Sequence, residues 1–124
     1  MTKRAVHSDS ISPVFGHYSS AVLKNDTLYL AGQGPFDKEQ KLVGDDIVTQ
    51  THQTMKNIRC LLEDNGFQMD DIVRSTVYLA DITHWAAFNE VYGQYFSTPY
   101  PARTVVACQL NGMLVEIECT AVRG

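Results

Sequence analysis

The sequence has no apolar run long enough to cross a membrane and no cluster of basic side chains. A membrane-spanning helix needs roughly 18 apolar residues, and the opening Met-Thr-Lys-Arg lacks the apolar segment of a signal peptide. The formal net charge of −4 disfavours a broad phosphate-binding surface, because nucleic-acid binders usually carry basic stripes. These absences predict a cytoplasmic protein without membrane contact and make nucleic acid a poor candidate for its partner.

Cysteine is also scarce, and its spacing excludes the usual cysteine-based sites. Cys60, Cys108 and Cys119 show no CxxC or CxxH pattern, so neither a zinc site nor a redox pair is predicted. Each of the three lies within an apolar segment. We therefore expect buried, reduced thiols, in keeping with a cytosolic compartment.

The composition is that of one globular domain, residues 1–124. Its hydrophobic fraction of 44% and charged fraction of 19% are ordinary, and this length suffices to bury a core without disulfide staples. Runs rich in β-branched and aromatic residues predict strands at 18–24, 27–31, 72–79, 103–108 and 114–122. Apolar residues at helical spacing predict helices at 47–62 and from Trp85 to Tyr95 or Phe96. Residues 1–17 lack periodicity and are expected to form an extended arm.

The predicted order is β, β, α, β, α, β, β, which is an α+β pattern with short connections. Asn111-Gly112 is a strong turn signal and predicts a hairpin between the last two strands. Two helices can cover only one face of the sheet. The other face mixes apolar and polar residues, and we expect another subunit to cover it.

One arginine stands at the start of a predicted strand. Pro99 and Pro101 end the preceding helix and force an extended entry, so Arg103 lies at the mouth of the strand. Its guanidinium offers a planar fork of donors that matches a carboxylate. A surface or structural ion pair is the alternative role for a single arginine. We expect Arg103 to face the strand that bears Glu116.

The last strand alternates between two kinds of residue. Glu116, Glu118 and Thr120 point away from its apolar face, and two carboxylates are costly to bury unless something pairs with them or solvent reaches them. Asn89 is a polar amide within the aromatic stripe of the second helix, where it can face a cleft. A cleft at a subunit boundary could therefore hold Arg103, Glu116, Tyr18 and Asn89 together.

Gly32-Gln33-Gly34 follows the second predicted strand. Two glycines separated by one residue let the backbone approach a ligand or another chain closely. The segment is no dinucleotide fingerprint, because a third glycine and an immediate helix are missing. A plain turn or bulge is the alternative interpretation.

Several segments together resemble one known family. They are Gly16-His-Tyr18, Ala31-Gly-Gln-Gly-Pro35, the helix from Gln50 to Leu62, Asp71-Ile-Val-Arg-Ser-Thr-Val-Tyr-Leu79, Phe88-Asn-Glu-Val-Tyr92, Pro101-Ala-Arg103 and Val115-Glu-Ile-Glu118. Any one of them is weak alone, but in this order they are specific. The chain resembles the RidA (YjgF) family of small imine deaminases over nearly its whole length.

The resemblance implies a chorismate-mutase-like fold of the bacillus type, in which three copies form a barrel with sites at the subunit interfaces. It also implies hydrolysis of enamine or imine intermediates, such as 2-aminoacrylate, to 2-keto acids and ammonia. By motif, the carboxylate-binding arginine of the family falls on Arg103 and its water-associated glutamate on Glu116. Its site tyrosine falls on Tyr18, its asparagine on Asn89, and the glycine that lines the site by its backbone on Gly32.

The site lining departs from the usual family pattern at three places. Gly-Pro-Tyr is Gly16-His17-Tyr18 here, and Ser-Gly-Gln-Ile/Val-Pro is Ala31-Gly32-Gln33-Gly34-Pro35. The cysteine that often follows the arginine by two residues is Val105. The retained arginine keeps deaminase chemistry, while the altered lining predicts a different imine or enamine acid as substrate.

Imine hydrolysis needs little acid/base machinery, because an imine is already electrophilic. We expect Arg103 to hold the substrate carboxylate and Glu116 to accept a hydrogen bond from the attacking water. Tyr18 and Asn89 would orient the substrate, and backbone groups near Gly32 and Val105 would contact its nitrogen or carboxylate. No metal and no organic cofactor is expected.

Two other functions remain open from the sequence. One is a ligand-sensing or chaperone-like trimer that binds 2-keto acids without turnover. The other is RNA cleavage, because the family includes proteins described as endoribonucleases. The acidic charge balance speaks against RNA, since RNA affinity depends heavily on phosphate neutralisation.

Overall fold

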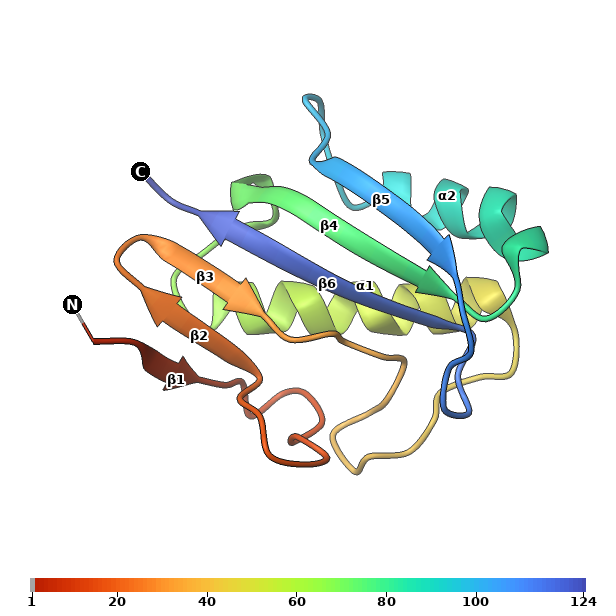
Figure 1. Ribbon diagram of the computed structural model, residues 1–124, viewed down its shortest axis with the longest axis horizontal. Helices are drawn as coiled ribbons and strands as arrows, with labels where there is room; N and C mark the ends of the chain where they lie inside the picture. Colours follow the sequence, from red (N-terminus) through yellow and green to blue (C-terminus); the bar gives the residue numbers. More distant parts are fainter. Residues whose placement is uncertain (1) are drawn as a thin grey trace.

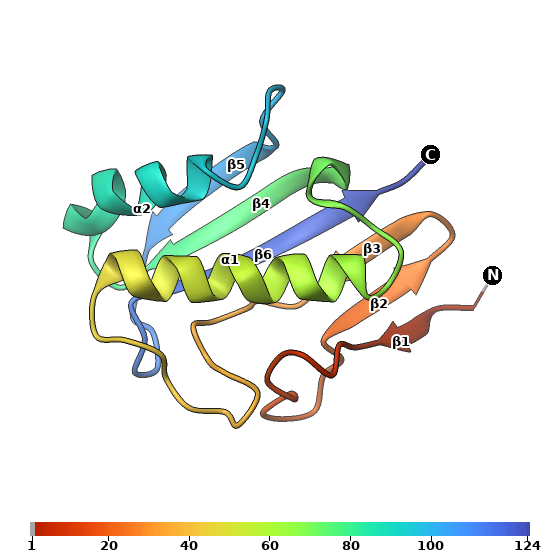
Figure 2. The ribbon, with the colours of Figure 1, turned by 180° about the vertical axis from the view of Figure 1, so that it is seen from behind.

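The fold is built on one six-stranded sheet in the order β1-β2-β3-β6-β4-β5, in a computed structural model that describes residues 2–124. The strands are β1 (Arg4–Val6), β2 (Ala21–Lys24), β3 (Thr27–Leu30), β4 (Ile72–Leu79), β5 (Ala102–Ala107) and β6 (Val115–Val122). The helices are α1 (Ile47–Glu63) and α2 (Trp85–Gly93). A 3-10 turn at Met69–Asp71 lies between α1 and β4, and another at Ile82–His84 leads into α2. Figures 1 and 2 show both helices on the same side of the sheet. The predicted α+β fold with two helices on one face is confirmed.

Hydrogen bonds near its start and an apolar face along its length fix the position of the long helix α1. Asp46 caps its start, where the carboxylate accepts a hydrogen bond of 2.9 Å from the Thr49 amide. Buried Gln50 donates to the Gly44 carbonyl at 3.0 Å and accepts from the Leu114 amide at 2.8 Å. The helix therefore also holds the segments that precede α1 and β6. Its apolar face packs into the core through Met55, Ile58, Leu61 and Leu62.

Strand β6 lies in the middle of the sheet, between β3 and β4. It runs antiparallel to both neighbours, whereas β5 pairs with β4 in parallel. The hairpin predicted between the last two strands is therefore wrong. Asn111-Gly112 does form a turn, with φ of 82° at Gly112, but the connection carries the chain past β4 instead of folding it back on β5. A local turn signal specifies a bend and leaves the choice of partner strand to the core.

Two further expectations need correction. Residues 1–17 are not a plain arm, because Arg4–Val6 pairs with β2 and forms the edge strand β1. Three residues are too few for an alternating pattern to show, and the pairing is made by backbone groups. All three cysteines are free, but only Cys119 is buried, while Cys60 and Cys108 are half-buried.

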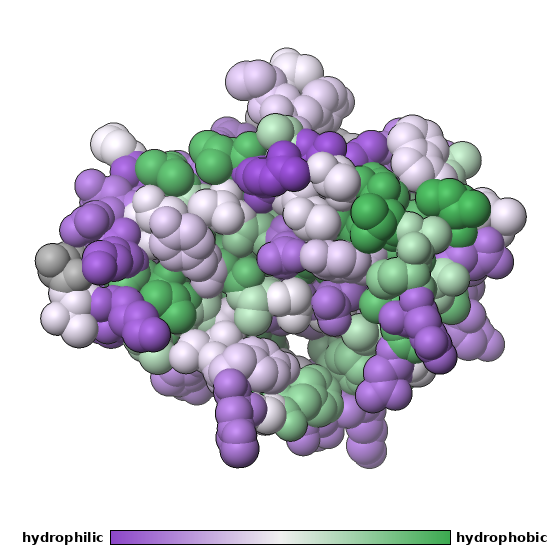
Figure 3. Space-filling view, viewed as in Figure 1, coloured by the Kyte–Doolittle hydropathy of each residue, from purple (hydrophilic) through white to green (hydrophobic). Residues whose placement is uncertain are grey.

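The side of the sheet opposite the helices, called the open face below, is covered by no helix of residues 2–124. It carries Thr76, Tyr78, Glu116, Glu118 and Thr120, which lie next to one another in register. Exposed apolar side chains at its margins are Tyr29, Val106 and Val122. Figure 3 shows apolar and polar groups interspersed over this surface. Along residues 2–124, no helix has the length and apolar character of a membrane span.

Candidate functional site

Arg103 points toward α2 from the beginning of β5. Its register partner on β4 is Ser75, a fully buried residue on the helix-facing side of the sheet. The guanidinium lies over three rings of α2, with distances of 5.7, 5.6 and 4.8 Å from Cζ to the ring centres of Trp85, Phe88 and Tyr92. Such stacking favours a cation electrostatically and restricts its orientation.

Hydrogen bonds fix the arginine and its aromatic support. Arg103 Nη1 donates to Asn89 Oδ1 at 2.8 Å. Beneath it, the Tyr92 and Ser75 hydroxyls are 2.6 Å apart, which locks the ring against β4. The guanidinium is thus held from one side by an amide and from below by rings, and its remaining donors are available to a ligand.

No carboxylate of residues 2–124 lies within ion-pair distance of Arg103. A half-buried cation that is paired only with a neutral amide is costly unless an anion completes it. Beside it is a pocket of about 410 Å³, lined by Asn89, Tyr92, Gly93, Tyr100, Pro101 and Arg103. The planar donor fork and the adjoining space suit a carboxylate.

Glu116 lies on the open face, against the backbone of Gly32. A Cβ atom at residue 32 would come within 2.8 Å of Glu116 Oε2, so any other residue there would displace the carboxylate from this position. The two residues, together with Tyr18, line a cavity of about 80 Å³. Burial, followed by the nearby negative charge of Glu118, raises the pKa of the Glu116 carboxyl. This carboxylate is therefore more basic than an exposed one.

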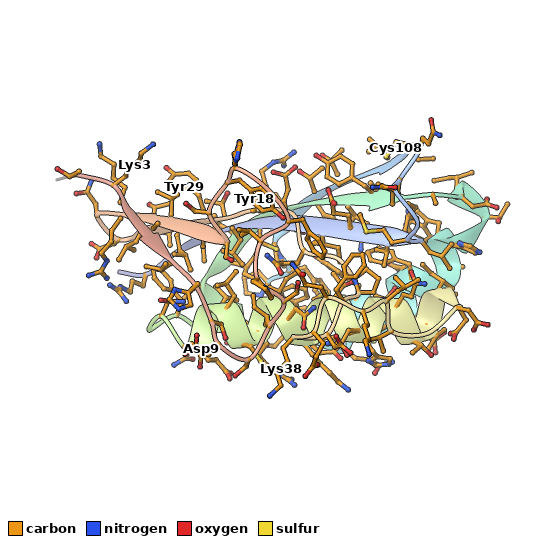
Figure 4. The ribbon with its side chains drawn as sticks, turned by 90° about the horizontal axis from the view of Figure 1, so that it is seen from below. Lys3, Asp9, Tyr18, Tyr29, Lys38 and Cys108 are labelled. Atoms are coloured by element: carbon orange, nitrogen blue, oxygen red, sulfur yellow. The ribbon has the colours of Figure 1, made fainter. Side chains whose placement is uncertain are left out.

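Tyr18 and Glu118 complete the surroundings of Glu116. Figure 4 shows Tyr18 on the open side of the sheet, and its hydroxyl accepts a hydrogen bond of 3.2 Å from the Phe15 amide. Glu118 is occupied, because the Tyr78 hydroxyl donates to it. That hydrogen bond, with burial and the two glutamates, raises the pKa of Tyr78 to about 12. Of the two glutamates, Glu116 is the one whose carboxylate is available to a molecule in the cavity.

Within one chain, the arginine and the glutamate lie on opposite faces of the sheet. Arg103 is in register with Ser75, whereas Glu116 is in register with Tyr78, and residues three apart on a strand point to opposite sides. The expectation that Arg103 faces the strand bearing Glu116 is therefore wrong for a single chain. The structure brings Asn89 and Arg103 together, and separately Tyr18, Gly32 and Glu116. Val105 lies on the same face as Arg103 and packs against the core.

Comparison with known proteins identifies one protein family over nearly the whole chain. The family described as Endoribonuclease L-PSP matches residues 9–123. The chain belongs to this family, which is also known as the YjgF/RidA family.

Relatives and solved structures in the family carry different names. A 2-iminobutanoate/2-iminopropanoate deaminase from Capra hircus is 37% identical over 100% of this chain and 93% of its own length. A RutC family protein from Pyrococcus horikoshii is 37% identical over 96% of this chain and 97% of its own. The crystal structure of RidA from an Antarctic Psychrobacter matches with a TM-score of 0.92 and 32% identity, covering 97% of this chain and 99% of that one. The family supports imine deaminase chemistry and includes proteins under other names.

In this RidA-family chain, sequence reasoning missed the aromatic support of the arginine. The helical spacing of Trp85, Phe88 and Tyr92 is typical of a core-facing stripe, and Phe88 and Tyr92 are buried. The same rings also form the platform for Arg103. Only the pairing of β5 beside β4, under α2, brings them together, although Asn89 within the stripe was a usable signal. Among residues 2–124, no cluster of three or more His, Cys, Asp or Glu side chains could hold a metal ion.

The raised pKa of Glu116 predicts how activity depends on pH. If the ionised carboxylate accepts a hydrogen bond from the attacking water, kcat/KM should fall as pH falls through this raised pKa. Glu118→Gln removes one of the two causes of the shift, so it should move the acid limb of the profile to lower pH. The check is the kcat/KM profile of both proteins on the same substrate, so that titration of the substrate cancels. An unchanged acid limb would contradict the assignment of that limb to Glu116.

Proposed function

We propose that the protein hydrolyses reactive enamine and imine intermediates, 2-aminoacrylate-like imino acids, to 2-keto acids and ammonia. The observation that carries this proposal is the guanidinium of Arg103, which is held in place but lacks a carboxylate partner among the described residues 2–124. A small, anionic and short-lived substrate must be caught by its carboxylate, since it offers little apolar area to bury. The similarity to a 2-iminobutanoate/2-iminopropanoate deaminase supports the same chemistry.

The reaction needs one water and one proton carrier. Arg103 binds the substrate carboxylate through two parallel N–H bonds, with Asn89 holding the guanidinium. With the imine nitrogen protonated, Glu116 takes a proton from water as the water oxygen bonds to the imine carbon, and the nitrogen becomes a neutral amine. Glu116 then gives this proton to the amine nitrogen. As the C–N bond breaks and ammonia leaves, Glu116 takes the hydroxyl proton so that the carbonyl forms, and it passes that last proton to the departing ammonia. Tyr18 and backbone groups near Gly32 and Val105 orient the substrate.

Each complete site is built from two copies of the chain, in a homotrimer. The half that contains Asn89 and Arg103 lies on the helix-facing side of β5, and the half that contains Glu116 lies on the open face. One copy cannot bring the halves together without breaking the sheet. The uncovered open face and its exposed apolar margins are consistent with contact to another copy.

Mixing two inactive variants tests this arrangement. Arg103→Ala and Glu116→Gln should each be inactive as pure proteins. When they are unfolded together and refolded as mixed trimers, about one quarter of the sites should pair an intact arginine half with an intact glutamate half from the adjacent copy. Activity should therefore return to about a quarter of the native level. Both groups acting from one chain would leave the mixture as inactive as its components, and a monomeric mass by light scattering would also contradict the proposal.

A further inference from the structure

The cavity beside Glu116 has a second wall, which the proposed reaction does not use. Phe36 and Met113 line it together with the carboxylate, and the Phe15 and Phe36 rings pack edge to face with 5.1 Å between their centres. Gly34 makes this wall possible. A Cβ atom there would lie 2.9 Å from both the Met113 sulfur and the Phe36 ring, so the missing side chain lets both close in on the cavity.

Hydrogen bonds hold this wall in place. Asn57 of α1, only 3% exposed, donates to the Gly34 carbonyl at 3.1 Å and to the Phe36 carbonyl at 2.8 Å. Gln33 exchanges backbone hydrogen bonds of 2.8 and 3.0 Å with Ile117 on β6. The segment that carries Gly34 is therefore anchored to both a helix and the sheet. These hydrogen bonds restrict movement of this wall of the cavity.

We propose that this cavity is a side-chain subsite that selects 2-imino acids with an aliphatic side chain of three or four heavy atoms. The inference rests on the proposed function, which places the reacting carbon beside Glu116 and the carboxylate at Arg103 of the adjacent copy. The side chain then points toward the apolar wall formed by Phe36 and Met113. The substrate class is a five- or six-carbon aliphatic 2-imino acid.

The size and chemistry of the cavity limit both the length and the polarity of the side chain that it accepts. Its volume of about 80 Å³ is well below the roughly 300–1,000 Å³ of pockets that enclose a drug-sized ligand, so it suits a small side chain. A methyl group leaves most of the apolar wall unfilled, while a benzyl group has too many atoms to enter. An anionic side chain would lose its hydration against the Phe36 and Met113 wall and would meet the Glu116 carboxylate instead of a cation.

Stable 2-keto acids allow the subsite to be measured without turnover. Calorimetric titration of the native trimer with pyruvate, 2-oxobutanoate, 2-oxopentanoate, 4-methyl-2-oxopentanoate and phenylpyruvate should show affinity rising about fourfold per added methylene, up to the five- or six-carbon acid. Phenylpyruvate should bind at least tenfold more weakly than the best aliphatic acid. An affinity that is flat with chain length, or highest for pyruvate, would overturn the subsite.

Variants at Met113 add an independent test. Met113→Ala shortens the wall and should move the affinity maximum to longer acids and improve phenylpyruvate, whereas the volume-conserving Met113→Leu should keep the native order. Met69→Ala is the matched control, because Met69 is also half-buried but lies in the 3-10 turn before β4. An unchanged preference in a folded Met113→Ala trimer contradicts the proposal. If the alanine variant does not fold, the native series and Met113→Leu decide.

The same ligands separate this inference from the proposed function. If affinity for 2-keto acids rose with chain length but no imino acid was hydrolysed, the deaminase would be refuted and the subsite supported. Hydrolysis of imino acids with affinity independent of chain length would support the deaminase and refute the subsite. Absence of binding by every 2-keto acid in the series would refute the subsite as well.

Discussion

Arg103→Ala should lower kcat/KM for imino-acid hydrolysis by ~10²–10⁴-fold, the loss expected when two hydrogen bonds to a charged group, each contributing about 1.5–3 kcal/mol, disappear together. The fold should survive, because the side chain lies at the start of an edge strand and is only half-buried. Arg103→Lys keeps the charge but loses the planar fork, so its defect should be smaller but still clear. The measurement couples an amino-acid oxidase or dehydratase to the purified variant and follows 2-keto acid above the spontaneous rate.

Arg59→Ala is a matched control for this substitution. Arg59 also lies over an aromatic ring, that of Tyr95 at 5.6 Å, but it sits on the outer surface of α1. Its removal deletes a similar stacking contact at a side chain that lines neither half of the site, so kcat/KM should stay within about twofold of the native value. If a folded, trimeric Arg103→Ala variant accelerated imino-acid hydrolysis as much as the native protein, the proposed deaminase mechanism would be contradicted. Loss of acceleration together with loss of 2-keto acid binding would support the carboxylate role.

Glu116→Gln should reduce turnover by ~10²–10⁴-fold while largely sparing the affinity for a stable 2-keto acid, because a general acid/base contributes about that much. The amide keeps the shape of the side chain beside Gly32 but cannot take a proton from water. Since the folded protein holds the pKa of Glu116 above its ordinary value, the protein loses stability as pH rises between the unfolded and folded pKa values. The glutamine variant should therefore be at least as stable as the native chain at neutral pH, as measured by denaturant unfolding.

Glu118→Gln tests whether turnover depends on the position of Glu116 or only on negative charge on the open face. Glu118 lies on the same side of β6 but is engaged by the Tyr78 hydroxyl, and a glutamine can still accept that hydrogen bond. Turnover of this variant near neutral pH should remain close to native. If Glu116→Gln hydrolysed imino acids at the native rate, Glu116 would be structural and Glu118 would become the candidate for the water.

The predicted helices and most strands follow from short-range patterns. The 3.6-residue period of α1, its Asp46 cap and the alternation of β6 all depend on neighbours within a few residues, so each could be predicted from the sequence. The same alternation correctly assigned Val115, Ile117, Cys119 and Ala121 to the buried face. Arg103, Glu116, Gly32 and Asn89 could likewise be selected, because charged, amide and glycine residues in otherwise apolar surroundings are conspicuous.

The tertiary structure decided how those residues are arranged relative to one another. Alternation relates side chains along one strand, but the relation between two strands depends on their register, which comes from pairing across the core. The insertion of β6 between β3 and β4 put Glu116 beside Gly32, and the parallel pairing of β5 with β4 turned Arg103 under α2 toward Asn89. The sequence by itself determined the elements and the chemical groups of the site. Only the long-range pairing of strands, in which Thr27 pairs with Val122, decided that the two halves face opposite sides of one sheet.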